Sequence, residues 1–235
     1  MPDEAVRQVL TGLFDRFNFT VMESTPFDIE VAVDPEMLGK AFEELVTGRH
    51  DSGSYYTPRP AVSFMCREAL KGCLEGQDTG LEYEAIARFV DHHYTEGIGV
   101  AQARRVAEAL ADVTVVDPAC GSGAYLLGMM QELIELQVRL FNVTQDSKSL
   151  YDLKLEIIQR NLYGVDIEDF AVNIAMLRLW LSLAIDYEGA TPEPLPNLDF
   201  KVVCGDSLLG LAPAAARRCR LHWARMWRRC SGWAS

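Results

Sequence analysis

The feature that most constrains this chain is the turn at residues 117–123, which reads Asp-Pro-Ala-Cys-Gly-Ser-Gly. It follows the apolar, β-branched run 113–116 and precedes the stretch 125–141, whose apolar spacing predicts a helix. A strand, a glycine turn and a helix bring backbone close to a ligand at the carboxyl end of a parallel strand. Gly121 and Gly123 lack Cβ atoms, so they can adopt positive φ. Taken alone, the two glycines are better explained by a tight strand–helix turn.

The segments after residue 112 alternate between strand and helix patterns. We predict strands at 113–117, 162–166 and 200–204, and helices at 125–141, 150–160 and 170–184, with an exposed polar insertion at 142–149. This order predicts parallel strands joined by right-handed crossovers, and therefore an α/β fold. Apolar residues surround the 170–184 helix almost completely, so we expect it to be deeply buried.

The sequence pattern of residues 1–111 predicts helices. One amphipathic helix is expected at 3–17, and a second begins at Asp34-Pro35 and ends near Val46. Thr57 can cap a third helix that Pro58 begins, with a loop at 72–80. Residues 81–111 predict one or two helices, with a break near Gly97 and Gly99.

Composition narrows the class of protein. Residues are 49% apolar, which is enough for a full core. No apolar run is long enough to cross a membrane, and the N-terminus does not have the pattern of a signal peptide. The six cysteines form no C-x-x-C pair and lie far in sequence from His92-His93, which argues against a zinc site or a disulfide framework. Free thiols in the cytoplasm are the simplest interpretation.

The charge is unevenly placed. The net charge is −12, and all 34 acidic residues precede residue 212, whereas residues 212–235 contain six arginines. An acidic body binds nucleic acid poorly, because affinity for DNA comes largely from neutralising phosphates. If DNA is the partner, another segment has to supply the positive surface.

An acidic residue ends or follows each predicted strand: Asp117, Asp166 and Asp206. Ligands of open α/β sheets bind at this edge, where carboxylates can accept hydrogen bonds from an amine, from ribose hydroxyls and from a purine amine. A dinucleotide is disfavoured, because the sequence has no G-x-G-x-x-G and Asp166 lies 49 residues after Asp117. The sequence also lacks a P-loop motif.

Simpler interpretations exist for several of these residues. Asp166 could be a helix N-cap, and Asp206 could be an ordinary turn acid. Tyr55 and Tyr56 could be packing residues, and Cys120 is expected to be a small packing residue rather than a nucleophile. The pair His92-His93 is expected to lie on a solvated helix face.

Four motifs in order carry a family resemblance. They are Gly-Ser-Tyr-Tyr-Thr-Pro at 53–58, the glycine turn, Gly-Val-Asp-Ile at 164–167 and Cys-Gly-Asp-Ser-Leu at 204–208. Together they resemble the N6-adenine DNA methyltransferases of bacterial restriction–modification systems, with the motif order of the gamma class. The resemblance covers roughly residues 34–211 and implies a partial Rossmann-like fold of about three parallel strands, preceded by a helical N-terminal region.

The resemblance implies that S-adenosylmethionine is the cofactor. Tyr56 and Thr57 would close over its methionine end, and Asp166 would bind the ribose, with Ile167 against the adenine ring and Asp206 at the adenine amine. The turn residues that would hold the amino-acid moiety are Asp117, Pro118, Ala119, Cys120, Gly121 and Gly123. The reaction would be methyl transfer to the exocyclic nitrogen of a flipped-out adenine.

The catalytic motif of this family, [Asn/Asp/Ser]-Pro-Pro-[Tyr/Phe], is absent, since the chain contains no Pro-Pro pair. We therefore expect no catalytic residues here, and a fragment that cannot methylate DNA alone. Residues 212–235 are rich in Arg and Trp and would be an out-of-frame or foreign tail. Without a further strand, 113–117 would be an exposed edge that favours association.

The expected organisation is a helical region at 1–80, a partial cofactor-binding domain at 81–211 and the tail at 212–235. DNA would bind through segments outside this chain, and a restriction or specificity subunit is a possible partner. The alternative functions are a non-catalytic S-adenosylmethionine-binding subunit that another chain completes, and a methyltransferase acting on protein or RNA.

Overall fold

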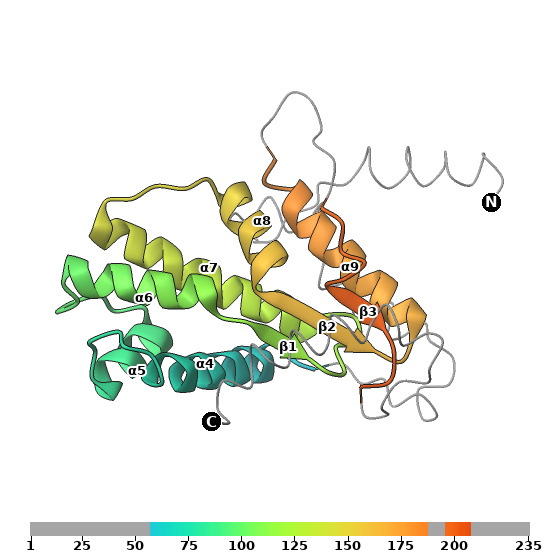
Figure 1. The fold of residues 1–235 in the computed structure, drawn as a ribbon, viewed down its shortest axis with the longest axis horizontal. Coiled ribbons are helices and arrows are strands. Elements are labelled where there is room, and N and C mark those ends of the chain that lie inside the picture. Colours follow the sequence, from blue (N-terminus) through green and yellow to red (C-terminus); the bar gives the residue numbers. More distant parts are fainter. Residues whose placement is uncertain (1–56, 188–195, 208–235) are drawn as a thin grey trace, which may run out of the picture.

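Three short parallel strands form the centre of the fold, with helices around them (Figure 1). The structure, a computed structural model, describes residues 57–187 and 196–207. In chain order its elements are α4 (Arg59–Glu75), α5 (Tyr83–His92), α6 (Val100–Asp112), β1 (Val115–Asp117), α7 (Ala124–Thr144), α8 (Leu150–Arg160), β2 (Leu162–Asp166), α9 (Asp169–Ala184) and β3 (Val202–Cys204).

The strand order is β1-β2-β3, and both pairs are parallel. This confirms the predicted partial Rossmann-like sheet, in which α7 and α8 connect β1 to β2 and α9 connects β2 to β3. Strand β2 lies between the other two, and its residues Leu162 and Val165 are buried. Within the described residues β1 pairs with β2 alone, so it lies at the sheet edge as expected.

Two glycines allow close helix packing around α7. A Cβ atom added to Gly128 would lie 2.3 Å from Cγ1 of Val62, so α4 approaches α7 at a position where only glycine fits. A Cβ atom on Gly123 would lie 3.0 Å from Cβ of Ala175, which belongs to α9. The start of α7 is therefore held between α4 and α9. In the view of Figure 1, α4 lies below and to the left of the strands, and α9 lies above them and extends to the right.

The helices differ from prediction at several ends. Pro58, not Thr57, is the N-cap residue of α4, and α4 continues through Gly72 into the predicted loop. Leu74 is 1% exposed, and burying this side chain outweighs the cost of about 1 kcal/mol for a glycine within a helix. The predicted break between two helices at 81–111 is confirmed by α5 and α6. The helices expected at 3–17 and after Asp34 lie outside the described residues.

The apolar residues of α7 and α9 are not all buried, and the burial predicted for α9 was partly wrong. In α7, Met130 and Ile134 are buried, whereas Val138 is 42% exposed. In α9, Val172, Leu179 and Leu183 are buried, but Phe170 and Leu177 are 52% and 37% exposed. Helix α9 contacts β2, β3, α7 and α8, and its buried residues lie on one half of the helix, away from Phe170 and Leu177. The burial predicted for nearly all faces of α9 is therefore wrong for the face that carries Phe170 and Leu177.

The helices of residues 57–187 and 196–207 are each too short or too polar to cross a lipid bilayer.

Candidate ligand-binding site

The glycine turn leaves the carboxyl end of β1 and is tied to β2. The amide of Cys120 donates a hydrogen bond to the carbonyl of Val165 at 2.9 Å, and the amide of Gly123 donates to the carbonyl of Cys120 at 2.8 Å. Gly121 and Gly123 both have positive φ, at 52° and 86°. The turn is thus a fixed structure at the sheet edge, and α7 begins immediately after it.

The two glycines of the turn serve different purposes. A Cβ atom on Gly121 would meet no atom within 4 Å, so the backbone at this residue faces open space. Gly123 is buried and packs on Ala175. The close approach of a ligand to the main chain is therefore possible at Gly121, whereas Gly123 is needed for helix packing.

Asp117 carries a buried oxygen without a hydrogen bond. Its Oδ1 atom accepts a hydrogen bond from the amide of Ala119 at 3.2 Å, while Oδ2 is buried and has no hydrogen-bond partner among the described residues. Burial raises the pKa of this carboxyl and Asp166 raises it further, whereas the Ala119 amide opposes both effects. A cationic donor, such as an ammonium group, would satisfy Oδ2 and stabilise the carboxylate.

Asp166 already accepts two backbone hydrogen bonds. Its Oδ2 atom accepts from the amide of Gly121 at 2.7 Å, and its Oδ1 atom accepts from the amide of Glu168 at 3.0 Å. The N-cap residue of α9 is Glu168, so Asp166 is not the helix cap that the simpler interpretation expected. A carboxylate can accept about four hydrogen bonds, so each oxygen keeps capacity for a ligand hydroxyl.

The strand register sets the three acids on a diagonal. Asp117 lies opposite Gly164, two residues before Asp166, and Asp166 lies opposite Cys204, two residues before Asp206. With strands about 4.8 Å apart and a rise of about 3.3 Å per residue, Asp117 and Asp166 are roughly 8 Å apart along the backbone frame. Asp206 follows two residues after the end of β3. The arrangement suits an elongated ligand with three separate polar groups.

The other predicted site residues flank this diagonal. Ile167 is 65% exposed next to Asp166, and Pro118 and Ala119 are exposed in the turn. Cys120 is 5% exposed, and burial raises the pKa of its thiol, which agrees with a packing residue. Thr57 is half-buried before α4, and Tyr56 lies outside the described residues.

Sequence reasoning missed the support beneath the turn. Arg178 of α9 is 4% exposed, and its guanidinium donates hydrogen bonds to the carbonyl of Ser122 at 2.8 Å and to the Ser122 hydroxyl at 3.2 Å. The available signal was a single arginine in an otherwise apolar helix, since an arginine inside a protein needs partners. Arg178 of α9 therefore holds the turn in position through Ser122.

Comparison with protein families and with characterised proteins supports the family resemblance. Residues 95–196 match the model of the MmeI DNA-methyltransferase domain. A Methanocaldococcus jannaschii protein named as a type II restriction enzyme and methyltransferase is 30% identical over an alignment of 230 positions, which covers 88% of this chain and 19% of that protein.

Two shorter matches agree. DNA methyltransferase A of Bacillus subtilis is 32% identical over 73 residues, covering 31% of this chain and 8% of that protein. Adenine-specific methyltransferase PglX of Streptomyces coelicolor is 31% identical over 100 residues, covering 42% of this chain and 8% of that protein. The chain thus spans less than a fifth of the length of these relatives, and the resemblance stated from the motifs is confirmed.

Proposed function

We propose that this chain, a relative of the restriction–modification DNA methyltransferases, forms the S-adenosylmethionine-binding part of an enzyme that methylates adenine N6 in DNA. The observation that carries this proposal is the buried Oδ2 atom of Asp117, beside open backbone at Gly121. An aminoacyl ligand offers an ammonium group to Asp117 and a carboxylate to the amides that begin α7 next to the turn. Methyltransferases as a class use S-adenosylmethionine as the methyl donor.

The order of acids on the diagonal supports specific roles. Asp117 and the turn would hold the methionine moiety, Asp166 would accept hydrogen bonds from the ribose hydroxyls, and Asp206 would accept one from the adenine amine. Ile167, which is exposed, would pack on the adenine ring. Tyr56 and Thr57 would close over the methionine end. Bound S-adenosylmethionine would supply an electrophilic methyl group on its sulfonium.

The acceptor side is proposed at the level of the whole enzyme. DNA is the proposed substrate, bound largely by segments outside this chain, with a restriction or specificity subunit as a further partner. Residues 1–80, 81–211 and 212–235 are the proposed helical region, cofactor domain and tail. The cytoplasm is the proposed compartment, because it holds both DNA and the methyl donor.

A second candidate is a non-catalytic S-adenosylmethionine-binding subunit. It is favoured by one sequence observation, the lack of any Pro-Pro pair that could present an adenine. In this case the chain would bind the cofactor, and another chain would supply the catalytic motif.

Isothermal titration of the chain with S-adenosylmethionine tests the shared part of both proposals. We expect one binding site, with affinity lost in Asp117→Asn and retained in Asp146→Asn, an exposed control. A labelled-methyl assay on adenine-containing DNA then tests the expected lack of catalysis. Binding without transfer agrees with a cofactor-binding part of an enzyme and with a non-catalytic subunit, methyl transfer by this chain alone contradicts the subunit, and no binding contradicts both.

A further inference from the structure

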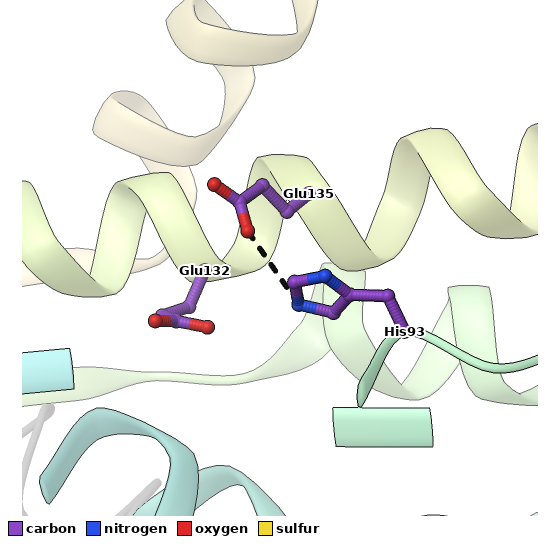
Figure 2. Close-up of side chains that lie close together, drawn as sticks. All are labelled: His93, Glu132 and Glu135. Carbon is purple, nitrogen blue, oxygen red and sulfur yellow. Dashed lines mark ion pairs between the residues drawn. The ribbon is translucent and has the colours of Figure 1, made fainter. Parts of the chain in front are cut away.

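A second cluster of polar side chains lies between α5 and α7, away from the glycine turn (Figure 2). His93 is the C-cap residue of α5 and has φ 58°, which turns the chain at this point. Glu132 and Glu135 come from one face of α7, since they are three residues apart. One donor atom from each of the three side chains lies within 4.8 Å of the other two.

The imidazole of His93 lies next to the carboxylate of Glu135, but the two groups do not form a hydrogen bond. Its Nε2 atom is buried, has no hydrogen-bond partner among the described residues and lies 3.5 Å from Oε2 of Glu135. An imidazole lone pair and a carboxylate oxygen repel each other at this distance unless a proton or a metal ion lies between them. His93 is therefore not on a solvated face, as predicted for His92-His93, whereas His92 is exposed.

Glu132 is oriented by neighbours on α4. It is 5% exposed, and its carboxylate accepts hydrogen bonds from the Ser63 hydroxyl at 2.6 Å and from Nε of Arg67 at 2.9 Å. Partners of this kind fix a metal-binding carboxylate in position while leaving lone pairs for a metal. Glu135 has a side chain that is 37% exposed and lies on the solvent side of the cluster.

The charges around the cluster are unbalanced. Arg67 pairs with Glu132, and Lys71 pairs with Glu68 at 2.6 Å and with Asp91 at 3.0 Å. With Glu135, four carboxylates thus face two cationic side chains. A divalent cation would reduce the excess of negative charge around Glu132 and Glu135.

We propose that His93, Glu132 and Glu135 bind a divalent first-row transition cation such as Zn²⁺, which clamps α5 to α7. A tetrahedral ion with ligands at about 2.0 Å places the ligand atoms roughly 3.3 Å apart. The 3.5 Å between His93 and Glu135 is close to this, and the two gaps to Glu132 are at most 4.8 Å. Small rotations of the His93 and Glu135 side chains toward Glu132 can close them. The exposed side leaves the fourth position to water. Glu132 lies about 13 Å along α7 from Gly123, so the ion is structural rather than part of methyl transfer.

Titration of the chelator-treated full chain with Zn²⁺, followed by calorimetry and by thermal unfolding, tests this site. We expect one Zn²⁺ per chain and a rise in Tm. In His93→Asn and in Glu135→Gln, the affinity for Zn²⁺ should fall by at least about tenfold, and the rise in Tm should be smaller. Asparagine is used at position 93 because it tolerates positive φ. The neighbouring His92→Asn is the matched control and should bind as the wild type does.

Co²⁺, used as a spectroscopic probe, distinguishes the proposed histidine and glutamate ligands from cysteine ligands. A site of one nitrogen and two oxygens gives visible bands without the sulfur-to-cobalt charge-transfer band of a thiolate site. The proposal is overturned by a thiolate band, by unchanged binding in both variants, or by no Zn²⁺ binding in the wild type. The last result would mean that an Nε2–H group of His93 faces Glu135 without a metal ion. Because S-adenosylmethionine binding is measured separately, failure here leaves the proposed function intact.

Discussion

At the scale of single residues, we expect Asp117 to stabilise a bound ligand at the cost of the stability of the ligand-free fold. Its Oδ2 atom is buried without a hydrogen bond among the described residues, so the carboxylate is costly until a cation pairs with it. We expect Asp117→Asn to weaken S-adenosylmethionine binding by about 10–100-fold, the value of a charged hydrogen bond of about 1.5–3 kcal/mol. Thermal unfolding of the ligand-free variant should show stability equal to or above the wild type. A loss of both binding and stability would contradict this view of Asp117.

The pH dependence of stability provides a separate test of the same carboxyl. Because burial raises its pKa in the folded chain, its contribution to stability is fully present below the pKa of the unfolded group and is lost as pH rises through the folded pKa. The stability of Asp117→Asn relative to wild type should therefore increase across this interval. Urea unfolding at a series of pH values, without ligand, measures the difference. A difference that stays constant with pH would show that Asp117 does not titrate in this interval.

Substitutions of Gly121 and Gly123 should affect cofactor binding and the free energy of unfolding to different extents. Gly123→Ala meets Ala175 at 3.0 Å with φ 86°, and we expect a loss of about 1–3 kcal/mol in the free energy of unfolding. Gly121→Ala meets no atom within 4 Å, so it should cost only about 1–2 kcal/mol through its positive φ while its methyl group blocks the cofactor.

Urea unfolding and S-adenosylmethionine titration measure the two effects of these substitutions. Gly72→Ala in α4, where a Cβ atom also meets nothing within 4 Å, is the control and should be neutral or slightly stabilising. If Gly121→Ala and the wild type bind the cofactor with equal affinity, the proposal that the ligand lies against Gly121 is wrong.

At the scale of elements, Asn161 joins the end of α6 to the start of β2. It is 1% exposed, and its Nδ2 atom donates hydrogen bonds to the carbonyls of Leu110, Ala111 and Val113 at 3.3, 3.1 and 2.6 Å. We expect Asn161→Ala to lower the free energy of unfolding by about 1–3 kcal/mol, because buried carbonyls lose their donor.

The control for this effect is Asn173→Ala on the exposed side of α9, which should change stability by less than about 0.5 kcal/mol. Urea unfolding measures both variants. The folded fraction of Asn161→Ala should keep wild-type cofactor affinity, since the side chain does not reach the turn. A matching loss of affinity would show that this junction also shapes the site.

The sequence predicted elements better than it predicted their environment. Strand β2 begins and ends at the predicted residues, Leu162 and Asp166. The mistakes concern tertiary contacts: α4 runs past Gly72 because Leu74 is buried, and α9 has an exposed stripe because its neighbours lie on one side. Periodicity records which residues are apolar, but it does not record how many faces of a helix are covered.

The candidate site shows the same division. The positions of Asp117 and Asp166 at strand ends followed from the order of elements alone. The bond from the Gly121 amide to Asp166 depends on how adjacent strands align, and the support from Arg178 depends on packing between α9 and the turn. Neither contact has a local sequence pattern. The cluster of His93 with Glu135 likewise joins residues that lie 42 positions apart in the chain.

At the scale of the whole molecule, charge decides how this chain can meet DNA. The net charge is −12, and its basic residues include six arginines at 212–235, a segment that holds no acidic residue. Phosphate contacts supply most non-specific affinity, with dissociation constants of roughly 10⁻⁴–10⁻⁶ M at physiological salt even for proteins that bind DNA. An acidic body should fall at or beyond the weak end of this range.

We therefore expect the chain to bind S-adenosylmethionine but to bind duplex DNA weakly, and only at low salt. Fluorescence anisotropy with a labelled duplex at about 50 and 200 mM salt measures this, and a steep loss of binding is expected because the contacts are ionic. Replacing the six arginines of 212–235 with glutamine should abolish the residual binding if that segment carries it. Tight binding that survives both higher salt and this replacement would place a DNA-reading surface within the acidic body, and the proposal that other segments hold the DNA would then be wrong.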